Sequence, residues 1–216
     1  CYYGESVMLV WAKAAAAVGT SLVLMASKGI CAADFGAESA PHFKVHSTHN
    51  THYYPVAGQT QEEIWAQLNG FANPHSIDQH TGTRPLGHAT FSYRYDYQSA
   101  YGSNADNCRV ENGNLEFNFD TVLPELADAG AIGEQLESNW LSFQEYIAEH
   151  EAGHHTLYNE LVTLIPQAMQ DVGEVPCSEL ADQVSMAVSQ VVAAVRQASA
   201  EYDADYGLEP QFASSL

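Results

Sequence analysis

Basic residues are scarce in this sequence. Seven Lys and Arg stand against 27 Asp and Glu, which gives a formal net charge of −20. Nucleic acids are polyanions that proteins bind through clustered Lys and Arg, and no basic cluster is visible, so nucleic acid is excluded from the expected partners. The acidic balance is typical of a soluble protein from a salty or extracellular setting, although a solvated acidic surface needs no partner at all.

Cysteines are also few. Of the four, Cys1 and Cys31 fall in a segment that we expect to be removed, which leaves Cys108 and Cys177. An even pair in an oxidising compartment favours one disulfide. The alternative is two unrelated buried thiols.

Hydrophobic runs long enough for a membrane span are missing as well. The apolar run at 14–26 is shorter than the span of about 20 residues that a bilayer requires, and Lys28 follows it. We expect residues 1–33 to be a secretory signal peptide, with the translation start at Met8 and cleavage near Ala33. The expected location is therefore secreted or periplasmic, with membrane contact only in transit. An uncleaved anchor is the weaker alternative.

The length of 216 residues suits one domain with a sizeable core. Residues 34–50 have no clear period and are expected to be a flexible lead-in, residues 51–210 a single domain, and residues 211–216 a tail. The lead-in and its end carry loosely spaced histidines that fit no compact zinc module and are expected to be exposed: His42, His46, His49 and His52.

The first half of the domain predicts a sheet. Tyr53–Val56 is expected to be a short edge strand, and Thr60 with Glu63 forms a capping box for a helix through Asn69. Residues 90–98 alternate aromatic and polar side chains, which indicates a strand with one covered face.

A hairpin is expected next. Two short strands, Cys108–Val110 and Leu115–Phe119, flank Asn112-Gly113, and Asn-Gly is a strong hairpin signal. Together these patterns predict a small, mostly antiparallel sheet with one short helix.

The second half predicts helices. One is expected from about Ile132 to Ile165, ending near Pro166, and a break follows around residues 173–176. A second helix then carries an apolar stripe that is expected to pack on the first. The fold class is therefore expected to be α+β, with a long helix that carries the active site and a second helix packed against it.

The sequence His150-Glu151-Ala152-Gly153-His154 lies within the first of these helices. Residues four apart share a helix face, so His150 and His154 can hold one Zn²⁺. Glu151 can then act as the general base toward a water at the metal, which is the chemistry of a metallopeptidase. The alternative is a helix that carries these residues on a solvated face.

A catalytic zinc normally has three protein ligands, and the candidates for the third lie at the end of the second helix. Asp203-x-x-Tyr206-Gly207 resembles the signature of aspzincin peptidases, in which the aspartate is the third ligand and the tyrosine supports the oxyanion. Glu201-x-x-x-Asp205 resembles instead the gluzincin arrangement. Asp203 is the preferred ligand and Tyr206 a candidate catalytic residue, with Glu201, Asp205 and Tyr206 as alternative ligands.

Other residues receive weaker assignments. His155 points about 100° away from His154 on a helix, so it is not expected to be a ligand. Arg84 and Arg94 could bind a substrate carboxylate, although structural ion pairs are commoner. Three histidines in the loop before the alternating strand or at its start are second-choice metal residues: His75, His80 and His88.

A larger set of landmarks, spread over residues 50–210, resembles a bacterial family of predicted secreted zinc-dependent proteases, which is largely a domain of unknown function. The resemblance implies an exported, zincin-like metallopeptidase with His150 and His154 as zinc ligands and Glu151 as base. Members of that family usually carry Thr-x-His-Gly after the Tyr-Asp pair, whereas Asp205-Tyr206-Gly207 stands here. The landmarks are Tyr53-Tyr54-Pro55-Val56-x-Gly58-x-Thr60, Gly82-x-Arg84, Cys108, Leu123-Pro124, Trp140, the motif at 150–154, Cys177 and Tyr202-Asp203.

These observations lead to one main hypothesis, an exported zinc-dependent peptidase that acts on proteins or peptides. Two alternatives remain open: a non-catalytic periplasmic zinc-binding or envelope module, and an amidase of cell-wall peptides. An open coordination position on the metal would favour catalysis over a structural site.

Overall fold

The computed structural model describes residues 42–70, 72–76, 84–128, 130 and 132–206. The expected signal peptide, residues 34–41 and the expected tail lie outside the described residues. The described residues belong to one compact unit, Ser39–Leu216, and the α+β class is confirmed. The elements in order are β1 (His42–Val56), α1 (Gln61–Asn69), β2 (His88–Tyr101), β3 (Asn107–Leu126), α2 (Glu134–Asn159), α3 (Leu161–Asp171), β4 (Val175–Pro176) and α4 (Leu180–Tyr206).

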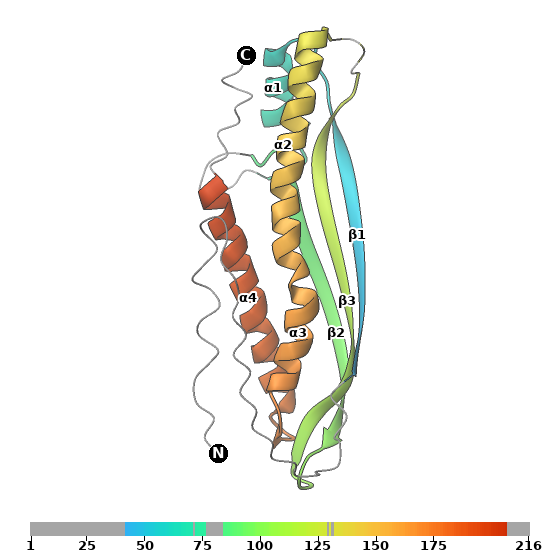
Figure 1. Ribbon diagram of the computed structural model, residues 1–216, viewed down its shortest axis with the longest axis vertical. Helices are drawn as coiled ribbons and strands as arrows, with labels where there is room; N and C mark the ends of the chain where they lie inside the picture. The colour runs from blue at the N-terminus through green and yellow to red at the C-terminus, as the bar shows by residue number, and fades with distance from the viewer. Residues whose placement is uncertain (1–41, 71, 77–83, 129, 131, 207–216) are drawn as a thin grey trace, which may run out of the picture. The chain divides into compact units, whose positions relative to one another are not determined.

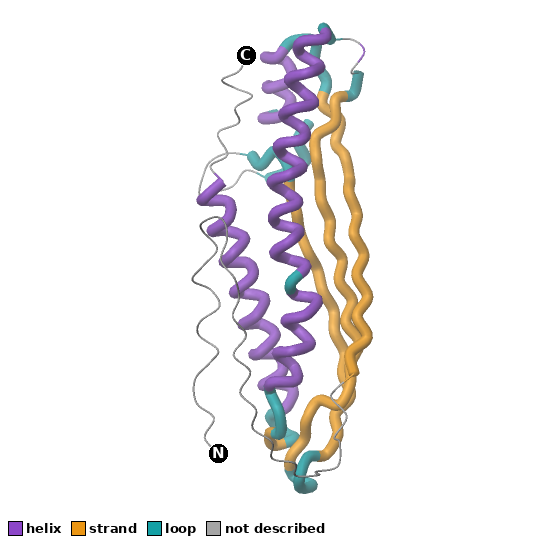
Figure 2. Tube along the Cα trace, viewed as in Figure 1, coloured by secondary structure: helices purple, strands orange, loops and turns teal. Residues whose placement is uncertain are grey.

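The sheet is mixed and has β3 at its centre. Strand order is β1-β3-β2, with β1 parallel and β2 antiparallel to β3, and the short β4 pairs with the start of β3. Helices α2, α3 and α4 lie along one face of this sheet (Figure 1; Figure 2). The aromatic alternation in β2 is confirmed, because its odd-numbered side chains from Phe91 to Tyr97 pack toward the core under the helices.

The expected flexible lead-in is wrong over residues 42–50, which form more than half of β1. This strand pairs with β3 in unbroken register from His42 opposite Asn112 to Val56 opposite Leu126. Its side chains are exposed or only partly buried as far as Tyr53. A strand without a buried face lacks the apolar alternation by which strands are identified in a sequence.

The expected Asn-Gly hairpin is also wrong, because β3 runs straight through Gly113. The glycine lies opposite Phe43 on one side and Tyr97 on the other. A Cβ at this position would lie 2.8 Å from the Phe43 ring and 2.7 Å from the carbonyl oxygen of Asp96. Gly113 therefore allows close approach between neighbouring strands and does not form a turn.

The helical half differs from expectation at one point. The long helix breaks at Glu160 and continues as α3 to Asp171, with Pro166 inside it, so the expected end at the proline is wrong. A proline inside a helix costs about 3 kcal/mol or more. Leu161, Ile165 and Met169 are fully buried on either side of it, and each such side chain contributes about 1.5–3 kcal/mol.

The apolar core forms two clusters. The first, which we term the disulfide-side core, joins β3 to α3 and α4 and includes Phe117, Ile165 and Val188. The second, the α1-side core, joins α1 to the end of β1 and the first half of α2, and includes Leu68 and Trp140. Five of the buried polar residues lie on β3, α2 and α4, elements that also contribute to these clusters: Thr121, His150, Glu151, His154 and Ser199.

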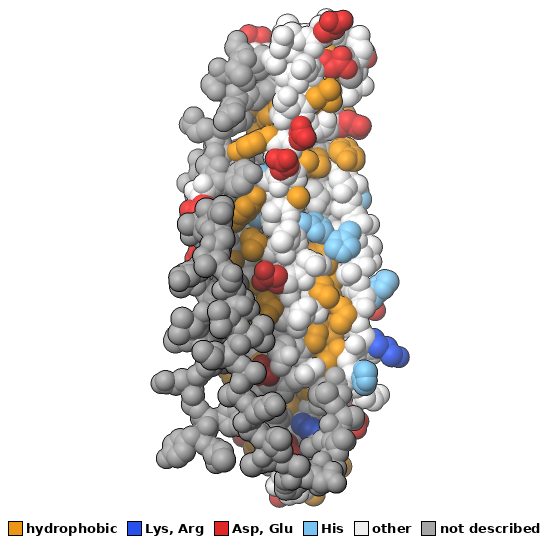
Figure 3. Space-filling view, viewed as in Figure 1, with side chains coloured by type: hydrophobic (Ala, Val, Ile, Leu, Met, Phe, Trp, Pro, Cys, Tyr) orange, Lys and Arg blue, Asp and Glu red, His pale blue; other side chains and the backbone are white. Residues whose placement is uncertain are grey.

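The surface carries the acidic excess of the sequence. On the face drawn in Figure 3, acidic side chains are scattered over the surface and basic ones are fewer. None of the helices in the described part of the chain combines the length and the apolarity needed to cross a membrane.

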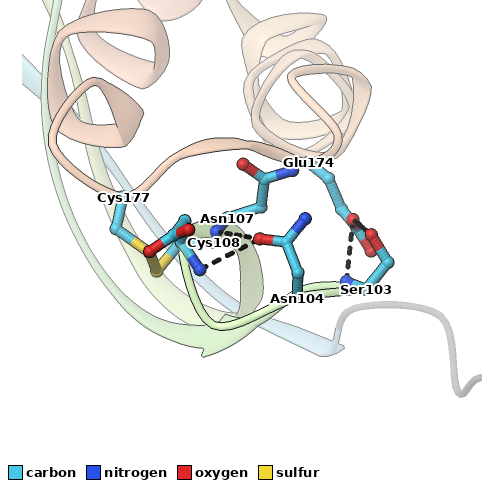
Figure 4. Close-up of a disulfide and its surroundings, with 7 residues drawn as sticks. Ser103, Asn104, Asn107, Cys108, Glu174 and Cys177 are labelled. Atoms are coloured by element: carbon cyan, nitrogen blue, oxygen red, sulfur yellow. Dashed lines mark hydrogen bonds between the residues drawn. A yellow bond between two sulfur atoms is a disulfide. The ribbon is translucent and has the colours of Figure 1, made fainter.

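The expected disulfide between Cys108 and Cys177 is confirmed (Figure 4). It links the start of β3 to the segment just before α4, across 69 positions of sequence. Polar contacts surround it: the Glu174 carboxylate accepts hydrogen bonds from the Ser103 backbone N–H at 2.9 Å and hydroxyl at 2.8 Å. The start of β3 and the segment before α4 are therefore held together by a covalent bond as well as by apolar contacts.

Candidate metal centre

Helix α2 places both histidines of the motif on its buried face. His150 and His154 are one turn apart, and their Nε2 atoms are 3.1 Å from each other. The rings lie edge to face, with centroids 4.8 Å apart. Two imidazole nitrogens thus converge on one point, as the i, i+4 spacing predicts.

Asp203 reaches the same point from α4. Its Oδ1 lies 2.8 Å from Nε2 of His154 and 3.2 Å from Nε2 of His150. Partial burial raises the pKa of Asp203, but the hydrogen bonds and charges of the two histidines outweigh it and hold that pKa well below its usual range.

Two of the other candidates for the third ligand, Glu201 and Asp205, are not brought to this point. Glu201 is exposed and accepts a hydrogen bond from Gln197, at 2.9 Å, and Asp205 is exposed. Tyr206 belongs to the last turn of α4, but its side chain lies outside the described part of the structure.

The donor set and its spacing fit a zinc ion. Ligand atoms bonded at about 2.0–2.1 Å to a tetrahedral zinc lie about 3.3 Å from one another. The three separations here, 3.1, 2.8 and 3.2 Å, are close to that spacing. Among the described residues, His150, His154 and Asp203 form the group of histidine and carboxylate side chains that could hold a metal ion. Metal binding itself stays a prediction.

A serine from α4 orients the second histidine. Ser199 is buried, and its hydroxyl oxygen lies 2.9 Å from Nδ1 of His154 and 2.8 Å from the hydroxyl of Tyr158. When Nδ1–H donates to the serine, the lone pair of Nε2 is free for a cation. With the serine as acceptor, this contact holds the tautomer that a metal ligand requires.

Tyr202 packs against both histidines. Its ring is stacked on that of His150, with centroids 5.1 Å apart, and meets that of His154 edge-on at 5.0 Å. The tyrosine can approach because Gly153 has no side chain: a Cβ there would lie 2.2 Å from the Tyr202 hydroxyl oxygen. The glycine of the motif thus makes room for the ring that holds both imidazoles in place.

Glu151 is buried beside the ligands. Its carboxylate accepts a hydrogen bond from the Ala89 backbone, and a Cβ at Gly87 would lie 2.7 Å from its Oε1. Burial raises the pKa of Glu151, although the nearby charges of His154 and His150 oppose the shift. A carboxyl group with a raised pKa is a stronger base than an ordinary one.

A cleft of about 570 Å³ opens over these residues. Its walls come from residues 85–89, which lead into β2 and include its first two residues, from α2 and from the last turns of α4. The lining includes Glu151 and all three candidate ligands. Among the described strands β2 is at the edge of the sheet, so no described strand pairs with its outer side.

Comparison with known proteins places the chain in a family. Residues 51–209 match a family described as bacterial protein of unknown function (DUF922). The chain belongs to this family. The match includes the motif on α2 and Asp203 on α4, but the description of DUF922 names no activity. No curated protein and no solved structure matches the chain.

Of the second-choice histidines of this DUF922 chain, His88 lies beside the centre and His75 lies next to His88. His88 lines the cleft, and burial together with the charge of His154 lowers its pKa. The ring of His75 is 5.4 Å from that of His88, and burial, with the charges of His88 and Arg84, lowers the pKa of His75 to about 4. His80 lies outside the described residues. His155 faces away, as expected, and packs against His49 and Phe119.

The two arginines singled out in the sequence have protein partners. Arg94 pairs with Glu116 at 2.5 Å on the exposed face of the sheet. Arg84 donates to the backbone carbonyls of Asn73 and His75. For both arginines, a structural role was expected more than the binding of a substrate carboxylate.

The sequence did not predict the roles of three residues at the centre. These are the hydrogen bonds of Tyr158 and Ser199 and the absence of a side chain at Gly153, which lets Tyr202 approach. Tyr158 and Ser199 lie among the apolar residues of helical stripes, where the sequence suggests only core packing. Their polar groups gain a role from the contact between α2 and α4, which is tertiary. One signal was available in the sequence: Ser199 is four residues before the candidate ligand Asp203, so the two share a helix face.

Proposed function

We propose that this chain is a zinc-dependent peptidase with Glu151 as its general base. The observation that carries the proposal is the meeting of Asp203, from α4, with both histidines of α2 beside a buried carboxylate in an open cleft. Neutral imidazoles and a carboxylate are ligands that catalytic zinc sites use.

Each residue would have a separate task. His150, His154 and Asp203 would hold the ion, and three protein ligands leave a fourth position open. A zinc ion held there would supply Lewis acidity, which polarises a carbonyl and acidifies water. Glu151 would accept the proton of the attacking water. Tyr206 stays our proposed oxyanion-supporting residue, on the basis of the sequence.

Substrate and location belong to the same proposal. We expect a protein or peptide substrate, because the cleft is open and lies at the beginning of an edge strand of the described sheet, where an extended chain could approach. Export is supported by the bond between Cys108 and Cys177, since disulfides persist mainly in oxidising compartments.

The test is Glu151→Gln in zinc-loaded protein. We expect casein hydrolysis to fall by about 10²–10⁴-fold, because the amide cannot accept a proton, while the zinc content by elemental analysis stays unchanged. Glu149→Gln is the matched control, because Glu149 is an exposed residue of the same helix. Equal activity of wild type and Glu151→Gln would refute the assignment of the base.

Peptidoglycan fragments assayed beside casein, each with a chelator control, separate the alternatives. Hydrolysis of cell-wall peptides without casein cleavage would indicate an amidase. Zinc binding without hydrolysis of either substrate would refute the peptidase and leave a zinc-binding module.

A further inference from the structure

Arg196 differs from the other arginines of the described chain. Arg94 and Arg109 have carboxylate partners, Glu116 and Glu174, and Arg84 donates to the backbone carbonyls of Asn73 and His75. Arg196 is exposed on α4, and among the described residues it contacts an aromatic ring and no carboxylate: its guanidinium carbon lies 5.4 Å from the centroid of Phe91. In a chain with 27 acidic residues, a cation without such a partner has its charge available.

Contacts between side chains lead from the metal centre to this arginine. Tyr158 lines the cleft, and its ring lies 4.7 Å from that of Phe91, over which Arg196 sits. On α4, Arg196 is one turn before Ala200 and two turns before Asp203, and both of these line the cleft. Arg196 therefore lies beyond one end of the cleft, on the same side of α4 as its wall.

The spacing sets the reach of a bound peptide. Seven residues of helix separate Arg196 from Asp203, which corresponds to about 10 Å along the axis. An extended peptide advances about 3.3 Å per residue. If the scissile bond of a peptide lies at the metal centre, the residue about three positions away from that bond would therefore reach the guanidinium.

The chemistry of the contact favours a carboxylate. A guanidinium stacked over an aromatic ring keeps its N–H donors free around its edge, and these match the two oxygens of a carboxylate. The ring also fixes the orientation of the side chain, so less rotamer freedom is lost on binding. Such charge-assisted pairs are stronger than neutral hydrogen bonds.

We propose that Arg196 is a specificity-determining residue that binds a carboxylate of the peptide substrate, about three residues from the cleaved bond. The carboxylate is that of an acidic side chain or of the peptide's C-terminus. This inference rests on the proposed peptidase function and names a substrate class for it.

A binding assay tests the inference without turnover. Zinc-loaded Glu151→Gln protein is titrated, by fluorescence anisotropy, with labelled alanine-based octapeptides that carry one Glu at each position in turn. One series has a free C-terminus and the other an amidated one. We expect one peptide to bind about tenfold more tightly than the all-alanine amide, and Arg196→Gln to remove that gain. Arg196→Lys should keep part of it.

Controls and outcomes keep the two proposals apart. Arg94→Gln makes the same charge change on the exposed sheet face and should not alter binding, and far-UV circular dichroism and zinc content should match wild type for every variant. A gain confined to Glu positions assigns a side chain, and a gain that needs the free C-terminus assigns the terminal carboxylate. No carboxylate-dependent gain, or a gain that survives Arg196→Gln, overturns the inference. Casein hydrolysis by wild type is judged separately, so loss of the peptidase proposal would be recognised by itself.

Discussion

The disulfide-side core and the metal centre share helix α4, but different interactions hold them. The core side is apolar, with fully buried residues such as Phe117 and Ile165, and a covalent bond closes its end. The metal centre instead buries imidazole, carboxylate and hydroxyl groups that contact one another. Buried polar groups cost free energy unless they are paired, so this region contributes less to stability than an apolar one of equal size.

The two regions meet on α4, which serves both. Val184, Val188 and Val195 belong to the disulfide-side core, and the turns that follow carry Ser199 and Asp203. The core thus fixes the helix, and the helix presents its last turns to α2. We infer that stability and metal binding depend on separate residues, so that each can be changed without the other.

The largest effect is expected from removal of the disulfide. The double variant Cys108→Ser, Cys177→Ser should lose about 2–4 kcal/mol of unfolding free energy, because the unfolded chain gains freedom. The melting temperature of metal-free protein should then fall by about 5–15 °C. Zinc affinity at 20 °C, measured by competition with a chromophoric chelator, should stay within about twofold, because no ligand is near the bond.

Reduction of the wild-type protein should reproduce this fall, which makes it the control for effects of the serines themselves. If zinc affinity dropped together with stability, the two regions would form one cooperative unit, and the separation inferred above would be wrong.

The opposite result is expected for Gly153→Ala. The new Cβ would overlap the Tyr202 hydroxyl, so the ring must leave its place against His150 and His154. Zinc affinity should fall by about 10–100-fold, the usual cost when the groups that orient ligands are disturbed. Stability of the metal-free protein should change by less than about 1 kcal/mol, since alanine favours the helix and offsets lost packing.

Gly133→Ala is the matched control at the start of the same helix. Apart from its chain neighbours, no described atom lies within 4 Å of a Cβ built at Gly133, so zinc affinity should stay near wild type. Because Gly133 is the N-cap of α2, where glycine is preferred to alanine, stability should fall by less than about 1 kcal/mol. Unchanged zinc affinity in Gly153→Ala would mean that the tyrosine ring has no positioning role.

The same contrast explains what the sequence could reveal. The motif on α2 and the stripe of α4 are local patterns, so the two histidines and the helical half could be predicted from spacing alone. Asp203 was chosen for its signature, and the structure brings it to the histidines. Ser199 and Tyr158 meet only because α2 and α4 pack together, and no local pattern encodes that contact.

The sheet was predicted less well for a related reason. Strand β2 has one covered face and shows it as alternation, whereas the β1 side chains as far as Tyr53 are exposed or only partly buried and show none. Asn112-Gly113 has the composition of a turn, but neighbours on both sides keep β3 extended through it. Local propensity was overridden there by pairing with partners distant in sequence.

A smaller effect, located at the boundary between the two regions, is expected from Ser199→Ala. This serine is one turn beyond Val195 of the disulfide-side core, and its hydroxyl joins His154 to Tyr158. Without it, Nδ1 of His154 is left buried and unpaired, which should cost about 1 kcal/mol of stability and about tenfold in zinc affinity. Ser189→Ala, at an exposed position of the same helix, should alter neither.

Tyr158→Phe then separates the two links of this chain of contacts. It keeps the ring and removes the hydroxyl that is 2.8 Å from Ser199, while the contact of Ser199 with His154 remains. Zinc affinity should therefore fall less than in Ser199→Ala, as measured by the same chelator competition. If Tyr158→Phe instead matched or exceeded Ser199→Ala, the tyrosine would act on the metal centre directly from the cleft that it lines, and the serine would be a residue of the core.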